Sequence, residues 1–177
     1  MGKVPAPVWP VAGSAVVPVA GVAQAAAKQQ ATGAEVSQPG GLLVTVRAGG
    51  PVFEPRTAGE QAAQAAAPAV SQVQVSVLGQ DTAAELGVKG VVLTVARADG
   101  DAASGAVGLD VDYAAFATGY GGDYGGRLRL VSLPGCATST PAVPECQVQT
   151  SLGSVNDPVA KRVSVDDVGS CPLILDT

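Results

Sequence analysis

The residues best placed for chemistry are two tyrosines and an aspartate in the glycine-rich segment TGYGGDYGG, at residues 118–126. Glycine lets a ligand approach the backbone closely, and the rings of Tyr120 and Tyr124 could stack on a sugar beside Asp123. A phosphate-binding G-x-G-x-x-G loop needs a strand before it and a helix after it, whereas the strand-like RLRLV follows here. We therefore interpret the segment first as a connection between two strands, and second as a ligand loop.

Acidic residues gather at the ends of candidate strands, and two chemistries would use them. A calcium site would draw on Asp99 and Asp101 in ADGDAASG, but these residues lack the spaced ladder of an EF-hand. Asp110 and Asp112 share one face of a candidate strand and have the residue types of a glycosidase acid and base. Nothing in their sequence context builds a cleft, so we interpret them as hydrated carboxylates and expect no metal or cofactor.

The composition excludes several classes of enzyme. The 177 residues contain no histidine, which removes Ser-His-Asp and Cys-His catalysis and metal sites that need imidazole. No serine lies in a G-x-S-x-G elbow, and no C-x-x-C pair occurs. The net charge of -5 and the absence of a Lys/Arg cluster argue against nucleic-acid binding. We therefore expect a protein that is not an enzyme and that binds no nucleic acid.

Three cysteines are an odd number, and two of them are close in sequence. Cys136 and Cys146 flank ATSTPAVPE, which has the composition of an exposed loop, whereas Cys171 stands alone near the end. In an oxidising compartment, the natural pairing is a local disulfide between Cys136 and Cys146. The alternative is a cytoplasmic protein with three free thiols, but an exposed loop is a poor place for a buried thiol.

Short strands are the elements that must position these residues. In QVQVSVL, the apolar Val73, Val75 and Val77 alternate with polar residues, which is typical of a half-buried strand. Strand-like runs recur in GVVLTVARADG, AVGLDVDY, RLRLVSL, CQVQTSL and AKRVSVDD, between turns rich in glycine, proline and aspartate. We expect Arg127 and Arg129 in RLRLV to pair across strands with the two acidic residues of LDVDY.

This spacing of strands predicts an all-β fold, an antiparallel β-sandwich of Ig or jelly-roll type over residues 71–168. One helical turn is expected in DTAAELG, where Thr82 and Glu85 have capping-box spacing and Gly87 suits the first residue beyond the helix. The predicted core consists of Val73, Val75, Val77, Val92, Leu93, Val95, Leu109, Val111, Phe116, Leu128 and Leu130.

The chain outside this domain has a different composition. Residues 1–70 are rich in alanine, proline, glycine and glutamine and should be largely loop, with strands near 13–20 and 41–48 on the sandwich edge. Prolines interrupt the apolar segment after Lys3, which favours an extended mature segment over a signal peptide. No apolar run reaches the ~18 residues that a membrane helix needs. Residues 169–177 are expected to form a tail.

A long run of these residues resembles a known family. GVKGVVLTVARADG matches the pattern GVxGxxLTVxRxDG, and VDYAAFATGYGGDYGGRLRLVSLPGC matches VDYxxFxxxYGGDYGxRLRLVxLPxC. Cys146 then follows, GSVND closes the run, and PVWPVAGSAVV near the start resembles a WPxAGxAxV opening. Over residues 8–165, and most closely over 86–157, the chain is similar to the N-terminal region of secreted actinobacterial RHS/YD-repeat proteins.

The resemblance implies a non-catalytic β domain of an exported protein, since many such relatives are polymorphic toxins or cell-surface proteins. In that family this region precedes the YD-repeat shell, so the implied partner is the rest of a larger secreted protein. The resemblance also implies that Cys136 and Cys146 form a family disulfide. The alternative function is a module that binds cell-surface glycans, with Tyr120, Asp123 and Tyr124 in its ligand loop. Any toxic activity would lie in sequence outside this chain.

Overall fold

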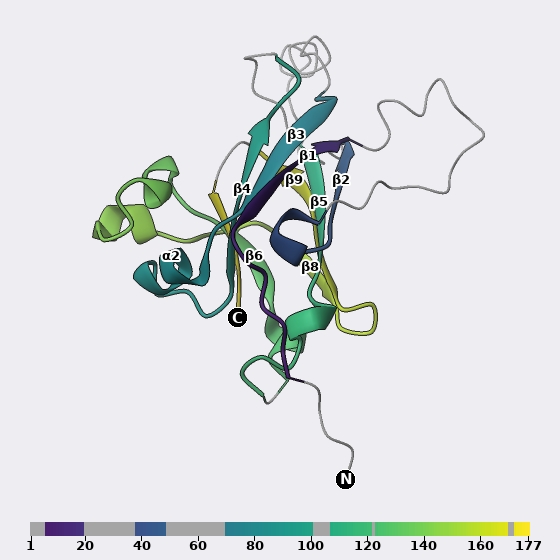
Figure 1. Ribbon diagram of the computed structural model, residues 1–177, viewed down its shortest axis with the longest axis vertical. Helices are drawn as coiled ribbons and strands as arrows, with labels where there is room; N and C mark the ends of the chain where they lie inside the picture. Colours follow the sequence, from purple (N-terminus) through teal and green to yellow (C-terminus); the bar gives the residue numbers. More distant parts are fainter. Residues whose placement is uncertain (1–5, 20–37, 49–69, 101–106, 122, 170–171) are drawn as a thin grey trace, which may run out of the picture.

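The structure is a computed structural model that describes residues 6–19, 38–48, 70–100, 107–121, 123–169 and 172–177 (Figure 1). Two antiparallel sheets enclose one main core, to which strands of both sheets contribute. The predicted antiparallel β-sandwich is therefore confirmed, while its assignment to the Ig or jelly-roll type stays a prediction. Most of the region predicted to be loop, 20–37 and 49–69, lies outside the described residues.

The larger sheet has six strands in the order β1-β3-β4-β10-β6-β7, and neighbouring strands are antiparallel. β1 forms one edge, in agreement with the edge strand predicted near residues 13–20. The bounds are β1 (Gly13–Pro18), β3 (Gln72–Val77), β4 (Val91–Arg97), β6 (Arg129–Ser132), β7 (Thr150–Ser151) and β10 (Pro172–Asp176).

The smaller sheet has four strands in the order β2-β5-β9-β8, again antiparallel. β2 forms its edge, as predicted for residues 41–48. The bounds are β2 (Val44–Ala48), β5 (Val107–Asp112), β8 (Val155–Asp157) and β9 (Arg162–Val168). The connections contain α2 (Gln80–Glu85) and the 3-10 helices η1 (Pro39–Gly41), η2 (Ala114–Phe116), η3 (Gly125–Arg127), η4 (Gly135–Thr138) and η5 (Pro144–Gln147).

The alternating pattern correctly identified the core, because successive side chains of a strand point to opposite faces. On β3, Val73, Val75 and Val77 are buried, while Gln72 and Gln74, which alternate with them, are exposed. Every residue of the predicted core is buried in the structure. The main core lies between the two sheets and also contains the rings of three aromatic residues, from Tyr113, Phe116 and Tyr124.

Three strands of the larger sheet are buried on both faces. Val92 on β4, Val131 on β6 and Ile174 on β10 point away from the main core and form a second cluster. Residues of α2 and η4, including Ala83 and Ala137, complete this cluster over the outer face of the sheet. This cover explains how the neighbours Val92 and Leu93 on β4 can both be fully buried.

The end of the chain corrects the expectation of a tail at 169–177. Residues 172–176 form β10, which lies between β4 and β6 and hydrogen-bonds to both (Figure 1). The sequence PLILD does not alternate, because a strand covered on both faces needs apolar residues at every position. Pro172 occupies the first position of the strand, where a missing N–H is tolerated.

The helical turn is where the sequence predicted it, but its cap differs. α2 begins after Gly79, and no side chain caps its first turn, so the capping-box role predicted for Thr82 is wrong. Gly87 has a φ of 70° just beyond the helix, as predicted for a glycine in this position.

Candidate functional site

The predicted ligand loop lies against an aromatic cluster formed by Trp9, Phe116, Tyr120 and Tyr124. The ring of Trp9 stacks on Phe116 with centroids 5.1 Å apart, and its centroid is 5.5 Å from that of Tyr120. Tyr120 and Tyr124 meet edge to face at 5.1 Å. A backbone hydrogen bond of 2.8 Å, from Val8 to the carbonyl of Ala115, holds the N-terminal segment in place. The cluster therefore joins the start of the chain to the loop.

The structure separates the three residues of the predicted ligand loop. Tyr124 is buried, and its hydroxyl donates a hydrogen bond to the backbone carbonyl of Lys89. Burial raises the pKa of Tyr124, and the charge of Asp176 adds to the shift. Tyr124 is a core residue and cannot offer its ring to a ligand, which corrects that part of the prediction. Tyr120 is 57% exposed and Asp123 is exposed, so these two remain accessible.

Two glycines of the loop leave room for rings of the chain itself. A Cβ atom on Gly119 would lie 2.5 Å from Cζ2 of Trp9. A Cβ atom on Gly125 would lie 2.7 Å from Cε2 of Tyr113. Because real Cβ contacts are not this short, any larger residue would displace an aromatic ring. The glycines therefore serve packing at these positions, which the sequence alone did not distinguish from access for a ligand.

Asn156 ties the loop to the smaller sheet, and sequence analysis missed its role. Its Nδ2 donates to the carbonyl oxygens of Gly125 and Leu128 at 2.8 and 2.9 Å, and its Oδ1 accepts from the Tyr113 hydroxyl at 2.7 Å. Burial raises the pKa of Tyr113, although the hydrogen bond to Asn156 acts in the opposite direction. In the sequence, the GSVND motif only marks the end of the family-like run, and a lone asparagine carries no periodic signal.

Asp110 belongs to a charged network on the smaller sheet. Arg47 on β2 donates to both of its carboxylate oxygens at 2.8 and 3.1 Å, and to Asp166 on β9 at 3.1 Å. Burial raises the pKa of Asp110, but hydrogen bonds from Arg47 and Ser164 outweigh it and the pKa is lowered. A carboxyl held as an anion in this way is a poor general acid for glycoside hydrolysis.

The predicted pairs between the two arginines of RLRLV and the acids of LDVDY do not form. Arg129 lies on β6 in the larger sheet, and Arg127 lies in η3, whereas Asp110 and Asp112 lie on β5 in the smaller sheet. The sequence placed these strands side by side because they follow each other along the chain. The sandwich instead separates them into opposite layers.

The calcium candidate Asp99 has protein partners. It accepts hydrogen bonds from the backbone and hydroxyl of Ser71 at 2.9 and 3.3 Å and pairs with Arg97 at 2.5 Å. Asp101 lies outside the described residues. Within the described ranges, no three His, Cys, Asp or Glu side chains gather as a metal site would require. Asp99 is therefore best explained as the partner that neutralises Arg97.

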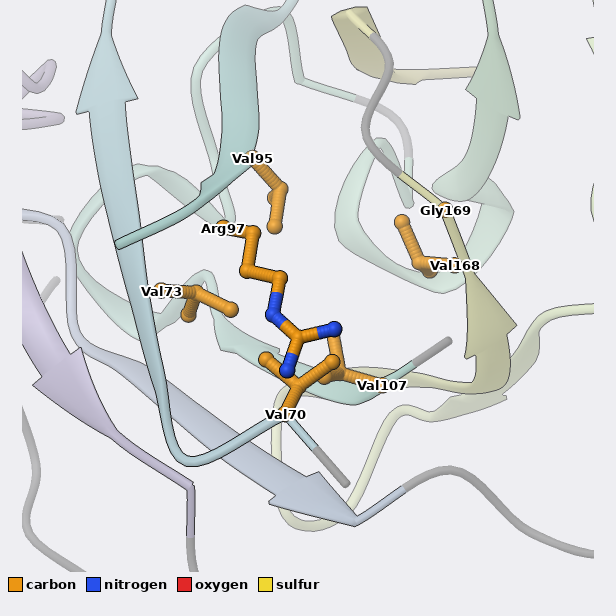
Figure 2. Close-up of a pocket in the computed structure, with 7 residues that line it drawn as sticks. All are labelled: Val70, Val73, Val95, Arg97, Val107, Val168 and Gly169. Carbon is orange, nitrogen blue, oxygen red and sulfur yellow. The ribbon is translucent and has the colours of Figure 1, made fainter. Parts of the chain in front are cut away.

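Arg97 itself reaches into a small cavity of about 10 Å³ between the sheets. Figure 2 shows its guanidinium beside Val70 and Val107, with valines of both sheets around it. A cavity of this size holds about one water molecule, so it has no room for an organic ligand. The lining residues are Val70, Val73, Val95, Arg97, Val107, Val168 and Gly169.

The predicted disulfide between Cys136 and Cys146 is confirmed, with Cα atoms 5.4 Å apart. The bond joins η4 to η5 in the segment between β6 and β7. Ala137 in η4 is buried in the second cluster, so the bridged segment helps to cover the larger sheet. Cys171 lies outside the described residues.

Replacing both cysteines of this bridge by serine should lower the free energy of unfolding by about 2–3 kcal/mol, because the unfolded chain regains the entropy of a short loop. The far-ultraviolet circular dichroism should stay that of a β protein, since the strands do not depend on the bridge. Thermal unfolding measures the loss, and non-reducing peptide mapping verifies the linkage. Recovery of Cys136 as a free thiol from the oxidised protein would contradict the pairing.

Comparison with known proteins gives no relative. No family model, no curated protein and no solved structure matches this chain. In the described part of the chain, no helix is both long and apolar enough to span a bilayer. The similarity to RHS/YD-repeat proteins therefore stays a prediction that rests on sequence motifs.

Proposed function

We propose that this chain is a non-catalytic structural domain in the N-terminal region of a secreted RHS/YD-repeat-type protein, where it serves in assembly. The observation that carries the proposal is the packing of the glycine-rich loop. Gly119 and Gly125 pack against Trp9 and Tyr113 of the same chain, so the loop contributes to the packing of the domain itself. A catalytic or phosphate-binding loop would instead keep such positions open for its substrate.

The hydrogen bonds of the polar side chains, which are made within the protein, support the same function. The hydroxyls of Tyr113 and Tyr124 donate to acceptors inside the protein, and Asp110 pairs with Arg47. Among the described residues, no buried side-chain nitrogen or oxygen lacks a hydrogen-bond partner. An active site commonly holds polar groups that only a substrate completes. The disulfide is in keeping with export to an oxidising compartment.

One observation favours the alternative, a module that binds cell-surface glycans. Tyr120 is 57% exposed beside Trp9, and an exposed aromatic ring is the usual platform for a sugar. Asp123 is exposed close by in the same loop and could accept hydrogen bonds from sugar hydroxyls. The buried Tyr124 takes no part in this version of the site.

The two functions can be separated with one pair of binding experiments. A structural domain should co-elute with a purified actinobacterial YD-repeat shell in gel filtration and should not sediment with insoluble cell walls. A glycan module should sediment with the walls, and Tyr120→Ser should abolish that binding. Val159→Ser, which changes a side chain that is 92% exposed in a different turn, is the matched control. Wall binding that depends on Tyr120, without binding to a shell, would overturn the structural function.

A further inference from the structure

A second pocket, of about 270 Å³, lies beside Trp9 on the side of the N-terminal segment. Three parts of the chain form it: the segment before β1, the η1–β2 connection, and the segment from the end of β5 into η2. Its lining consists of Val8, Trp9, Pro10, Gly40, Gly41, Leu42, Leu43, Asp112, Ala114, Ala115 and Phe116. This volume is close to the lower end of the range for small-molecule sites.

Backbone hydrogen bonds between the three segments form the pocket in advance. Val11 donates to the carbonyl of Gly40 at 2.9 Å, and Asp112 donates to the carbonyl of Leu43 at 3.0 Å. Gly40 has a φ of 61°, and a Cβ atom there would lie 1.8 Å from the carbonyl oxygen of Val11. The approach of these segments thus depends on glycine. The two bonds occupy the N–H groups of Val11 and Asp112 and the carbonyl groups of Gly40 and Leu43.

The chemistry of the lining is unusual for a polar protein surface. Most of the side chains in the lining are apolar or aromatic, and among the described lining residues Asp112 alone carries a charge. One of its oxygens, Oδ1, accepts a hydrogen bond of 2.8 Å from the backbone of Ala114. Within the described part of the chain, no basic side chain forms an ion pair with Asp112. The pocket therefore combines an apolar surface with one carboxylate that retains acceptor capacity.

We propose that this pocket binds an alkylammonium group, with the carbon chain against Trp9 and Phe116 and the ammonium group on Asp112. A charged N–H donor on a carboxylate makes a strong hydrogen bond, and the carbon chain gains from burial against apolar side chains. A sugar fits less well, because each of its hydroxyl groups would need a polar partner, and among the lining side chains Asp112 and Trp9 alone carry hydrogen-bonding groups. The net charge of -5 also favours a cationic ligand.

Trp9 is the single tryptophan of the chain, so its fluorescence reports directly on the pocket. We expect hexylammonium to change this fluorescence in a saturable way, and hexanol, which has the same shape without the charge, to bind about tenfold more weakly. Raised salt should weaken the binding of hexylammonium but not of hexanol. Nα-acetyl-lysine amide tests whether a lysine side chain fits as well as a free amine, and binding of either one supports the proposal.

Asp112→Asn is the decisive variant, because an asparagine oxygen can still accept the hydrogen bond from Ala114. It should weaken the binding of hexylammonium about tenfold and leave that of hexanol unchanged. Asp167→Asn is the matched control, since Asp167 is exposed near the end of β9. Arg162, which lies opposite Asp112 in the sheet, is at the start of the same strand. Equal affinity for hexylammonium and hexanol in the unaltered protein would overturn the proposal, and this comparison needs no variant to fold. Saturable binding of glucose at the same tryptophan would also overturn it.

Discussion

We expect a chain that ends at Gly169 to lose cooperative folding. The deletion removes β10, which among the described strands is the only hydrogen-bonded link between β4 and β6 in the larger sheet. Leu173 and Leu175 of this strand belong to the main core, and Ile174 belongs to the second cluster. Both cores therefore lose side chains at the same time, and two strands lose half of their backbone partners.

The expected size of this effect is comparable with the stability of a whole domain. Burial of one large aliphatic side chain contributes about 1.5–3 kcal/mol, so the three in β10 contribute about 5–9 kcal/mol. A typical domain is stable by about 5–15 kcal/mol in total. The unpaired backbone groups of β4 and β6 add to the loss. Near-ultraviolet circular dichroism and a denaturant titration measure the outcome.

Deletion of Thr177 alone is the control, because this residue is exposed and lies beyond the strand. It should leave the unfolding transition unchanged. Leu173→Ala offers an intermediate case, in which a cavity in the main core should cost about 2–5 kcal/mol while the fold survives. A truncated chain that still unfolds cooperatively, with the midpoint of the full chain, would show that β10 is dispensable.

The sequence predicted those strands best that are buried on one face. β3 alternates because one side faces the core and the other faces solvent, and its valines were assigned correctly. β10 was not predicted, because burial on both faces removes the alternation of apolar and polar residues. PLILD therefore has the pattern of neither a half-buried strand nor a loop. The pairing of β10 could not be predicted either, since its partners β4 and β6 lie far away in sequence.

The candidate site shows the same limit for side chains. Tyr120 and Tyr124 are chemically identical, yet one is exposed and the other is buried on the carbonyl of Lys89. Local sequence does not determine which of two tyrosines in a glycine loop turns inward, because their partners are distant in sequence: both rings pack on Trp9, and the Tyr124 hydroxyl bonds to Lys89. The disulfide was predictable because both cysteines and the loop between them are local.

Asn156→Ala should be the most damaging substitution of a polar residue in this loop region. It leaves the buried hydroxyl of Tyr113 with only its long contact of 3.5 Å to the carbonyl of Asp157, and it removes the shared donor of the Gly125 and Leu128 carbonyls. Buried polar groups that lose their partners cost about 1–3 kcal/mol each. Because Asn156 is half-buried, water will replace part of this loss, and we expect about 2–4 kcal/mol in total. Thermal and denaturant unfolding measure it.

Two further variants distinguish hydrogen bonding from packing. Val155→Ala on the same strand is the control, since that side chain is 68% exposed and should change stability by less than about 0.5 kcal/mol. Asn156→Asp keeps the shape but places a carboxylate against two carbonyl oxygens, which should raise the pKa of the new carboxyl. A raised folded-state pKa means that this variant loses stability as pH rises through its range and is closest to the unaltered protein in acid. A deficit that stayed the same from pH 3 to pH 8 would mean that shape, and not the two donated hydrogen bonds, makes Asn156 necessary.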